Sequence, residues 1–347
     1  MTAPVNRRIV LAARPHGRPS AEHFRLEQAL VPEPGPDQIL CRTIYLSLDP
    51  YMRGRISDAR SYRPPLPIGE VMVGGTVGEV VRSNVEGFAP GDVVVGHGGW
   101  QDYALLRNDE ARKVDPALAP ISTALGVLGM PGQTAYVGLR EIGRPQPGET
   151  LVVAAASGAV GAVVGQIAKL RGCRVVGIAG SRAKCDYVVR ELGFDACIDH
   201  HAPDFADQLR AACPHGIDVY WENVGGRVLE AVLPLLNDFA RVPVCGLIAW
   251  YNATEPPPGP DRTPHLLRQI LVRRLTVRGF IVYDFDPGNF LAEAGQWVRD
   301  GRLRYREDIR DGLENAPAAF AGLFEGENFG KLLIRVAPLD RSPGAVL

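Results

Sequence analysis

The hydrophobic pattern of the chain changes near residue 125. Before it, short apolar runs are separated by Gly and Pro, as at residues 38–48, 69–81 and 91–106. Several short strands with turn residues between them are typical of a β-barrel or sandwich-like domain. Residues 31–38, "VPEPGPDQ", are predicted to form a loop.

From about residue 124 to residue 310, strand-like runs alternate with helix-like segments. The predicted strands lie at 151–155, 174–179, 196–199, within 216–225, at 240–248 and at 275–285, and the predicted helices lie at 159–171, 183–192, 205–212, 227–236 and 290–300. This alternation predicts βαβ units and a parallel sheet covered on both faces. Prolines predict a loop at 255–264, and residues 328–339 return to strand character.

A small-residue turn follows the strand at 151–155. Residues 156–161, "ASGAVG", fit the G-x-G-x-x-G pattern with Ala156 in the first place. Gly158 would allow the backbone to approach a pyrophosphate, and Gly161 would allow the helix to pack closely on the strand. The N–H groups that open the helix would bind phosphate. Alone, this pattern also fits a plain packing turn, but the strand before it and the helix after it favour a nucleotide site.

The second strand ends at residues 179–181 without an acid. Sites for NAD place Asp or Glu there, about 20 residues after the turn, to bind the ribose 2′-hydroxyl. Here Arg182 and Lys184 follow, and His200 and His201 come after the third strand. A cationic corner of this kind favours NADPH over NADH. A solvated basic surface is the alternative, and either histidine could be an ordinary surface residue.

Size and composition limit the classes of protein to which this chain could belong. The chain has 347 residues, 46% hydrophobic and 22% charged, which fits about two globular domains. Its formal net charge of −1 argues against a nucleic-acid surface. There is neither a signal peptide nor an apolar run long enough to span a membrane, which favours the cytoplasm. The six cysteines include no CxxC pair, so reduced thiols are expected and no zinc cluster is visible.

Several longer stretches carry a family resemblance. They are residues 45–55 ("YLSLDPYMRGR"), 126–136 ("GVLGMPGQTAY"), 151–181, 220–226 ("YWENVGG"), 244–252 ("VCGLIAWYN") and 312–336. On these stretches the chain resembles the zinc-free medium-chain dehydrogenase/reductases of the alkenal/one oxidoreductase group. That group includes leukotriene/prostaglandin reductases and plant double-bond reductases, and the likeness is greatest to the bacterial curcumin reductases.

The resemblance implies an α/β protein of two domains. A GroES-like β-barrel domain would span residues 1–125 and be completed by 311–347, and a Rossmann NADPH-binding domain with a doubly wound parallel sheet would span 126–310. The active cleft would lie between them, and a homodimer is expected. Zinc-dependent relatives carry a Gly-His-Glu segment where this chain has "LPIGEVMVG" at 66–74, so no metal is expected.

The implied reaction is NADPH-dependent reduction of the carbon–carbon double bond of an α,β-unsaturated ketone or aldehyde. Hydride would go to the β-carbon and a proton to the α-carbon. A quinone reductase on the same fold and a non-catalytic NADPH-binding protein are the alternatives. The developing enolate oxygen needs a neutral hydrogen-bond donor, and tyrosine, with a pKa of about 10, is suitable.

Three tyrosines are the candidate catalytic residues. Tyr251 comes first because it follows the fifth strand, where ligands gather in open sheets. Tyr51 and Tyr62 come second, because the N-terminal domain should supply the other wall of the cleft. Each could instead be a packed aromatic residue. Arg53 and Arg55 could hold either the cleft or only the fold.

The turn, the cationic corner and the resemblance together give the predicted cofactor contacts. These are Gly158, Ala159, Val160, Gly161, Gly180, Ser181, Lys184, His200, Asn223, Cys245, Gly246, Leu247, Tyr251, Phe280, Ile281, Val282 and Asn328. His200 departs from the family, because many relatives have tyrosine at this position. A histidine can also donate a hydrogen bond to phosphate.

Overall fold

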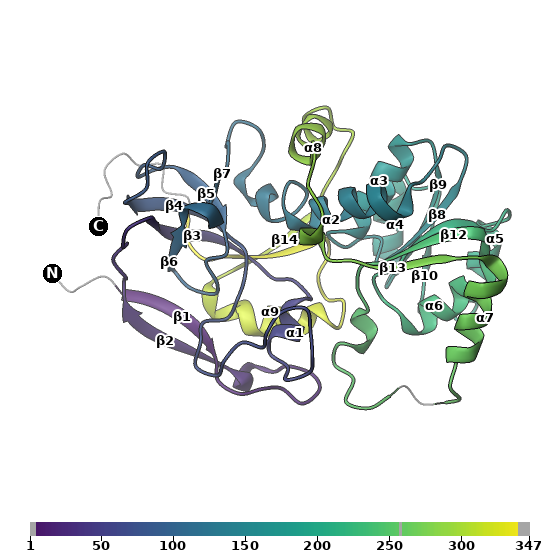
Figure 1. Ribbon diagram of the computed structural model, residues 1–347, viewed down its shortest axis with the longest axis horizontal. Coiled ribbons are helices and arrows are strands. Elements are labelled where there is room, and N and C mark those ends of the chain that lie inside the picture. Colours follow the sequence, from purple (N-terminus) through teal and green to yellow (C-terminus); the bar gives the residue numbers. More distant parts are fainter. Residues whose placement is uncertain (1–4, 257–258, 339–347) are drawn as a thin grey trace. The chain divides into compact units, whose positions relative to one another are not determined.

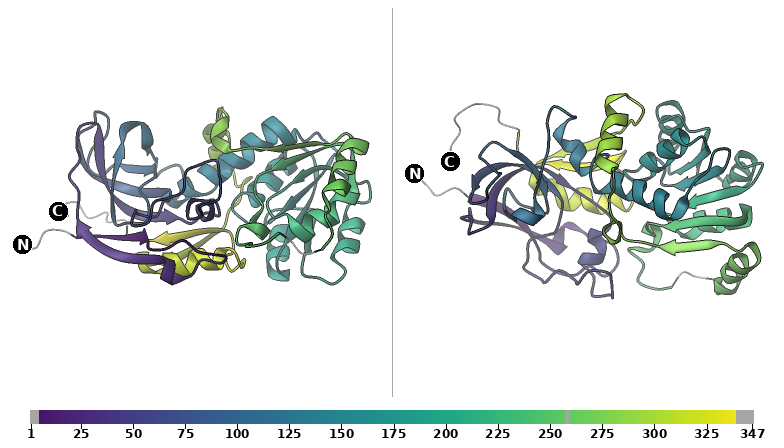
Figure 2. Two further views of the ribbon diagram at one scale, coloured as in Figure 1. Left: turned by 60° about the horizontal axis from the view of Figure 1, so that its bottom comes forward. Right: turned by 45° about the horizontal axis from the view of Figure 1, so that its top comes forward.

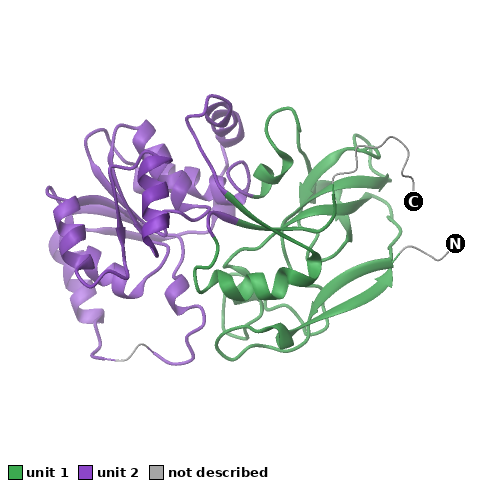
Figure 3. Ribbon diagram, turned by 180° about the vertical axis from the view of Figure 1, so that it is seen from behind, with its two compact units in different colours: residues 1–125, 307–328, 332–347 green, residues 126–306, 329–331 purple. Residues whose placement is uncertain are grey.

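The computed structural model describes residues 5–256 and 259–338, which form two compact units (Figures 1 and 3). Unit 1 comprises residues 1–125, 307–328 and 332–347, and unit 2 comprises residues 126–306 and 329–331. The predicted fold class, a β-rich domain joined to a doubly wound α/β domain, is confirmed. Residues 257–258 of the predicted loop, and residue 339 of the predicted last strand, lie outside the described residues.

Unit 1 is built on antiparallel strands. A hairpin pairs β1 (Val5–Leu11) with β2 (Phe24–Leu30). The larger sheet runs in the order β14-β15-β3-β4-β5-β7, and β6 pairs with β3. Its strands are β3 (Gln38–Ser47), β4 (Thr76–Ser83), β5 (Val93–Gly96), β6 (Tyr103–Arg107), β7 (Arg112–Lys113), β14 (Glu307–Asp311) and β15 (Lys331–Arg335).

The core of unit 1 joins its N-terminal strands to a C-terminal helix. The buried ring of Trp100 stacks on Phe24 of β2 with ring centroids 5.5 Å apart. It also meets the edge of Phe320, in α9 (Ala316–Leu323), at 5.7 Å. Burial of these large aromatic side chains stabilises both segments together. The C-terminal return of the chain is therefore part of the core of unit 1.

Unit 2 is a parallel sheet in the order β10-β9-β8-β11-β12-β13. Its strands are β8 (Thr150–Ala154), β9 (Arg174–Ala179), β10 (Ala196–Asp199), β11 (Ile217–Trp221), β12 (Leu236–Val244) and β13 (Thr276–Gly279). The chain builds β8, β9 and β10 outward in one direction, then returns to place β11 on the other side of β8. Open parallel sheets bind ligands where the strand order reverses in this way, at the carboxyl ends of the strands.

Helices pack on both faces of this sheet, which Figure 2 shows in two further views. On one face Val152, Val176 and Tyr220 share a core with side chains of α5 (Phe205–Ala212), α6 (Gly226–Val232) and α7 (Thr263–Arg273). On the other face lies α2 (Met130–Gly138), so close to β11 that a Cβ on Gly138 would come within 2.4 Å of Trp221. The other helices of the unit are α3 (Gly161–Leu170), α4 (Arg182–Arg190) and α8 (Phe290–Arg299).

Two strands end earlier than predicted, at the edge where ligands gather. β12 ends at Val244 rather than at residue 248, because the N–H groups of Cys245 and Gly246 donate to the carbonyl of Glu222. β13 ends at Gly279, and the 3-10 turn Val282–Asp284 follows. The predicted strand over residues 280–285 is therefore wrong.

Several elements are missing from the sequence prediction, among them α2 and α9. The predicted loop at 255–264 runs into α7, with Pro264 in its first turn, where the missing proline N–H leaves no helical hydrogen bond unmade. The β1–β2 hairpin is also missing, because β1 does not alternate cleanly between buried and exposed residues.

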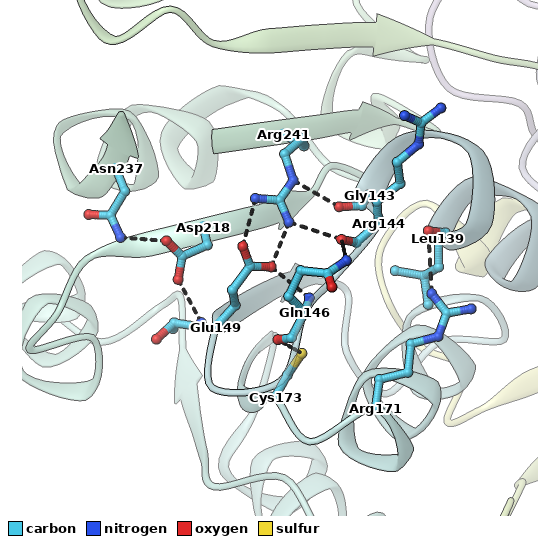
Figure 4. A network of polar contacts seen from close by, with 11 residues as sticks. Leu139, Gly143, Arg144, Gln146, Glu149, Arg171, Cys173, Asp218, Asn237 and Arg241 are labelled. Carbon is cyan, nitrogen blue, oxygen red and sulfur yellow. Dashed lines mark hydrogen bonds and ion pairs between the residues drawn. The ribbon is translucent and has the colours of Figure 1, made fainter. Parts of the chain in front are cut away.

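A polar network holds the amino ends of the strands in unit 2 (Figure 4). Arg241 binds Glu149 with two hydrogen bonds, from Nη1 at 2.9 Å and from Nη2 at 2.5 Å. Asp218 accepts hydrogen bonds from the backbone N–H of Thr150 at 2.8 Å and from Nδ2 of Asn237 at 2.7 Å. Two-pronged pairing of this kind fixes geometry. These charged groups bind one another at the edge away from the carboxyl ends, so we assign the network to stability.

Candidate nucleotide and substrate site

The turn between β8 and α3 lies at the point where the strand order reverses. Ala155 has a left-handed φ of 52°, and the N–H of Gly158 donates to its carbonyl at 2.9 Å. A Cβ on Gly161 would lie 2.3 Å from the same carbonyl oxygen, so only glycine fits there. Gly158, Ala159 and Val160 are half-buried. The start of α3 is therefore brought close to the strand, as a phosphate-binding turn requires.

The corner after β9 combines a helix cap with a cation. The N-cap of α4 is Ser181, whose Oγ accepts the N–H of Lys184 at 3.3 Å. This cap places Lys184 in the first turn of α4, where it is half-buried. Arg182 is exposed and pairs with Asp186 at 3.0 Å. Of the two cations, the structure therefore turns Lys184 inward and leaves Arg182 on the surface.

The structure also brings His200 to this corner. A Cβ on Gly180 would lie 3.3 Å from Nε2 of His200 and 3.7 Å from Nε2 of His201. The two histidine rings are 4.0 Å apart. Gly180, Lys184 and His200, which are separated in the sequence, thus meet at the ends of β9 and β10. They form the strongest candidate for a phosphate site in unit 2.

Charges around His200 are mainly positive. Burial lowers the pKa of His200, and His201 lowers it further. Lys184 and Arg227 act in the same direction, while Asp199 opposes them. Arg227, on α6, was not among the predicted residues, and nothing in its sequence neighbourhood shows that it approaches β10. The corner therefore favours an anion, which would offset the repulsion among these cations.

Asn223 joins β11 to β8 across the reversal point. Its Nδ2 donates to the carbonyl of Ala154 at 2.8 Å, and its Oδ1 accepts from Nε1 of Trp221 at 3.1 Å. The side chain is thus held next to the turn at 156–161. This position agrees with a place beside the cofactor, although both polar ends of Asn223 already have protein partners.

The segment after β12 carries Tyr251 and three predicted cofactor contacts, Cys245, Gly246 and Leu247, all half-buried. The Tyr251 hydroxyl accepts the N–H of Leu247 at 3.3 Å. Burial raises the pKa of Tyr251, and the Leu247 N–H partly offsets that rise. The phenol is therefore neutral near pH 7. Because its oxygen acts as an acceptor for Leu247, its own O–H can donate to a ligand.

The predicted contacts after β13 have a different environment. Phe280 is buried and meets the edge of Trp221 with centroids 5.7 Å apart. Val282 is also buried, and Ile281 donates its N–H to Asp284 at 3.3 Å. The side chains of Phe280 and Val282 therefore pack in the interior, and their contact with a cofactor stays a prediction.

The N-terminal candidates belong to unit 1. Tyr51 directly precedes α1 (Met52–Arg55) and packs against the core that contains Trp100. Tyr62 is exposed. Arg53 is buried and donates to the carbonyl of Gly17 at 2.8 Å, while Arg55 donates to Pro64 at 2.9 Å. These contacts show both arginines supporting loops of unit 1, and the roles of the two tyrosines stay predictions.

The segment after Asn328 is bound to unit 2. The ring of Phe329 meets the edge of Tyr187 on α4 at 5.2 Å, and the guanidinium of Arg306 lies 4.0 Å from its centroid. The N–H of Lys331 donates to the carbonyl of Arg306 at 2.9 Å. Asn328 therefore leads directly into a segment fixed to the helix that carries Lys184.

Glu222 is a buried group at the reversal point that the sequence prediction omitted. Its side chain is 1% exposed and follows β11. Only the position of Glu222 beside Asn223 hints at a role, because burial of a carboxyl group does not show in a single sequence.

Within residues 5–256 and 259–338, no cluster of three or more His, Cys, Asp and Glu side chains is placed to hold a metal ion. No helix in that part of the chain is long and apolar enough to cross a membrane. All six cysteines are free thiols.

Comparisons with known proteins point to oxidoreductases over most of the chain. Two family profiles match, "N-terminal domain of oxidoreductase" over residues 7–114 and "Zinc-binding dehydrogenase" over residues 159–298. The NADPH-dependent curcumin reductase of Escherichia coli (strain K12) is 59% identical over 338 residues, which cover 96% of this chain and 98% of that protein. The 2-alkenal reductase (NADP(+)-dependent) of Nicotiana tabacum is 37% identical over 341 residues, with 96% and 98% covered.

A solved structure extends this likeness to the fold. The crystal structure of CurA from Vibrio vulnificus in complex with NADPH superimposes with a TM-score of 0.92. It is 54% identical in sequence, and the match covers 96% of this chain and 99% of that one.

Proposed function

The chain belongs to the medium-chain dehydrogenase/reductase family, and from this membership we propose that it reduces the carbon–carbon double bond of α,β-unsaturated ketones and aldehydes with NADPH. The observation that carries the proposal is the 59% identity to a curcumin reductase over nearly the whole of both chains. The resemblance predicted from the sequence is confirmed at the level of the family.

The residues of the corner after β9 fit NADPH. Lys184 and His200 lie where a 2′-phosphate would offset the local positive charge. Asp199 opposes this positive charge, and its Oδ1 already accepts the N–H of His201 at 2.9 Å. When bound, NADPH supplies the hydride. The turn at 156–161 would hold its pyrophosphate, and Lys184 and His200 would select it over NADH.

Tyr251 is the proposed donor to the enolate oxygen. The phenol is neutral near pH 7 and fixed by Leu247. A fixed neutral donor stabilises charge that develops in the transition state more than charge in the ground state. We propose Tyr51 and Tyr62 as substrate contacts from unit 1 and assign them no further step.

The experiment that tests the function is NADPH oxidation with a panel of acceptors. An alkenal, a bulky dienone and a benzoquinone are compared under the same conditions. A double-bond reductase consumes NADPH with the alkenal and the dienone and yields saturated products. Turnover with the quinone alone would indicate a quinone reductase, and NADPH binding without turnover on any acceptor would indicate a binding protein.

Tyr251→Phe tests the proposed role of the phenol. Loss of one donor of this type lowers kcat by about 10²–10³-fold. We expect that loss with an enone, while the Kd for NADPH stays near that of the wild type. Tyr103→Phe, at a half-buried tyrosine of β6 in unit 1 to which no role in the reaction is assigned, is the matched control. An unchanged kcat in Tyr251→Phe would remove Tyr251 from the mechanism.

We also propose that the protein is a cytoplasmic homodimer that acts without a metal. The six free thiols agree with a reducing compartment. The outermost strand β13 is exposed along its whole length, and Phe239, Leu271 and Val277 expose apolar side chains on this side of the sheet. An unpaired strand edge with apolar neighbours favours pairing with a second copy. Activity is expected to survive dialysis against a metal chelator.

A further inference from the structure

Glu222 carries a buried carboxyl group at the point where the strand order of the sheet reverses. Its Oε1 accepts two backbone hydrogen bonds, from Val224 at 2.6 Å and from Gly225 at 2.8 Å. These bonds close a turn in which Gly225 and Gly226 have φ values of 77° and 55°. The carboxyl group thus fixes a turn whose backbone is accessible mainly to glycine.

The backbone of Glu222 binds the segment that leads to Tyr251. Its N–H donates to Pro243 at 3.0 Å, and its carbonyl accepts the N–H of Cys245 at 2.9 Å and of Gly246 at 3.2 Å. One residue therefore anchors both the turn after β11 and the start of the segment after β12.

The turn 223–226 also holds residues 247–251 in place. Ile248 donates to the carbonyl of Asn223 at 3.2 Å, and Ala249 donates to that of Val224 at 3.0 Å. Trp250 lies over Gly225, with ring atoms 3.3 Å from the site of a Cβ. The N–H of Tyr251 donates to Ile248 at 3.3 Å. The position of Tyr251 thus depends on the turn that Glu222 closes.

The surroundings of the second carboxyl oxygen indicate that a neutral side chain at position 222 is able to hold the turn 223–226. Oε2 of Glu222 and the hydroxyl of Tyr220 are both fully buried, and neither makes a hydrogen bond of good geometry within the described residues. Burial raises the pKa of Glu222, while the N–H groups of Val224 and Gly225 and the nearby Tyr220 hydroxyl lower it in part. The largest contributions to the pKa are therefore burial and hydrogen-bond donors. The contacts that hold the turn need an acceptor oxygen rather than a negative charge.

We propose that Glu222 is a positioning residue for the reductase, which holds the turn 223–226 and thereby places the Tyr251 hydroxyl for donation to the enolate. This inference rests on the proposed role of Tyr251. It differs from a purely structural role, because it predicts that the effect of Glu222 on turnover passes through one hydroxyl group.

A double-mutant cycle tests the proposal. The variants are Glu222→Ala, Tyr251→Phe and the combination of both, measured at saturating NADPH with one enone. A displaced catalytic group costs up to about 10²-fold in rate, so Glu222→Ala should lower kcat by that order even at saturating NADPH, where weaker binding of the cofactor no longer limits turnover. In the Tyr251→Phe background, Glu222→Ala should lower kcat by less than about twofold, because the hydroxyl that it positions is already gone.

Two conservative variants keep the test decisive if Glu222→Ala fails to fold. Glu222→Gln keeps the acceptor oxygen and should retain kcat within about twofold of the wild type, with an unchanged pH profile. Glu222→Asp is one methylene shorter and should lower kcat per folded molecule. Both are checked for folding by circular dichroism.

The possible results distinguish failure of the positioning role from failure of the role of Tyr251 and from failure of the proposed function. Equal loss of kcat from Glu222→Ala with and without the Tyr251 hydroxyl would overturn the positioning role, as would a Glu222→Gln variant as impaired as Glu222→Ala. If instead Tyr251→Phe alone keeps full kcat, the proposed role of Tyr251 fails and the positioning role fails with it. Absence of enone reduction by the wild type would overturn the proposed function itself.

Discussion

The cap of α4 sets the backbone position of Lys184. The Ser181 cap fixes the first turn of α4, so the ammonium group projects from a rigid base. Lysine binds phosphate as a point charge, and hydrogen bonds to charged groups contribute about 1.5–3 kcal/mol. Lys184→Ala should therefore weaken NADPH binding by about 10- to 100-fold and leave NADH binding nearly unchanged. Fluorescence titration with each cofactor measures both values.

Arg210→Ala is the matched control for this prediction. Arg210 is an exposed cation on α5 of the same unit, and it pairs with Asp207 at 2.9 Å. Its removal changes the net charge by the same amount and should affect neither cofactor. Equal weakening of NADPH and NADH binding by Lys184→Ala would exclude the 2′-phosphate role.

His200 should make NADPH binding depend on pH. Its pKa lies below the ordinary value for histidine because of burial and because of His201, Lys184 and Arg227, with Asp199 opposing. The ring is thus neutral at pH 7 and gains a proton only as the pH falls. A bound 2′-phosphate favours the protonated ring, so binding takes up a proton and tightens at lower pH.

His200→Asn isolates this effect from the titration of the phosphate itself. Between about pH 7.5 and about pH 5.5 the wild type should gain about tenfold in NADPH affinity relative to the variant, the scale of one charged hydrogen bond. NADH, which lacks the 2′-phosphate, should show no such gain. The prediction would be contradicted if the ratio of the NADPH Kd of His200→Asn to that of the wild type stayed constant across this pH range.

At the scale of elements, the two glycines of the turn before α3 have separable roles. A Cβ on Gly161 would lie 2.3 Å from the carbonyl oxygen of Ala155, whereas a Cβ on Gly158 would lie 3.2 Å from it. Gly161→Ala should therefore lower the free energy of unfolding by about 1–3 kcal/mol, because backbone atoms must shift. Gly158→Ala should lower stability less than Gly161→Ala does, but it should weaken NADPH binding at least about tenfold, because the methyl group occupies the approach of the pyrophosphate.

Urea unfolding without cofactor and titration with NADPH separate the two roles. Gly165→Ala is a useful third variant, because its Cβ would meet the ring of Phe194 at 1.9 Å, farther along α3. It should lower stability while the folded fraction binds NADPH normally. Equal stability losses for the Gly158 and Gly161 variants would refute the assignment.

The elements that the sequence predicts best belong to unit 2, where short apolar strands alternate with amphipathic helices. β9, β10 and α5 lie at the predicted residues. The ends of β12 and β13 could not be predicted, because each is set by hydrogen bonds to distant residues, such as those from Cys245 and Gly246 to Glu222. Helix α7 contains no buried residue, which explains why its hydrophobic pattern gives no clear signal.

At the scale of the whole molecule, the site is assembled from the ends of strands far apart in the sequence. The resemblance supplied most of its residues, and the order of the strands explains why Asn223 lies beside Ala154. Arg227 and Glu222 could not be found in this way. Arg227 approaches His200 from α6, which belongs to another βαβ unit, and Glu222 is distinguished only by its burial.

The proposed homodimer depends on the same sheet, at its outermost strand. All residues of β13 are exposed, and its only partner strand in the described chain is β12. A lysine at position 277 would replace an exposed apolar side chain with an ammonium group that loses its water when two copies join at this edge. Val277→Lys should therefore shift the protein from a dimer to a monomer. Light scattering coupled to size-exclusion chromatography measures the mass directly.

Val189→Lys, at an exposed apolar residue of α4, is the control and should remain dimeric. Because the proposed cofactor contacts lie at the strand ends rather than along β13, monomeric Val277→Lys should bind NADPH with nearly the affinity of the wild type. Loss of turnover in a monomer that still binds NADPH would show that assembly completes the site. A Val277→Lys protein that keeps the mass of the wild type would place any interface on another surface.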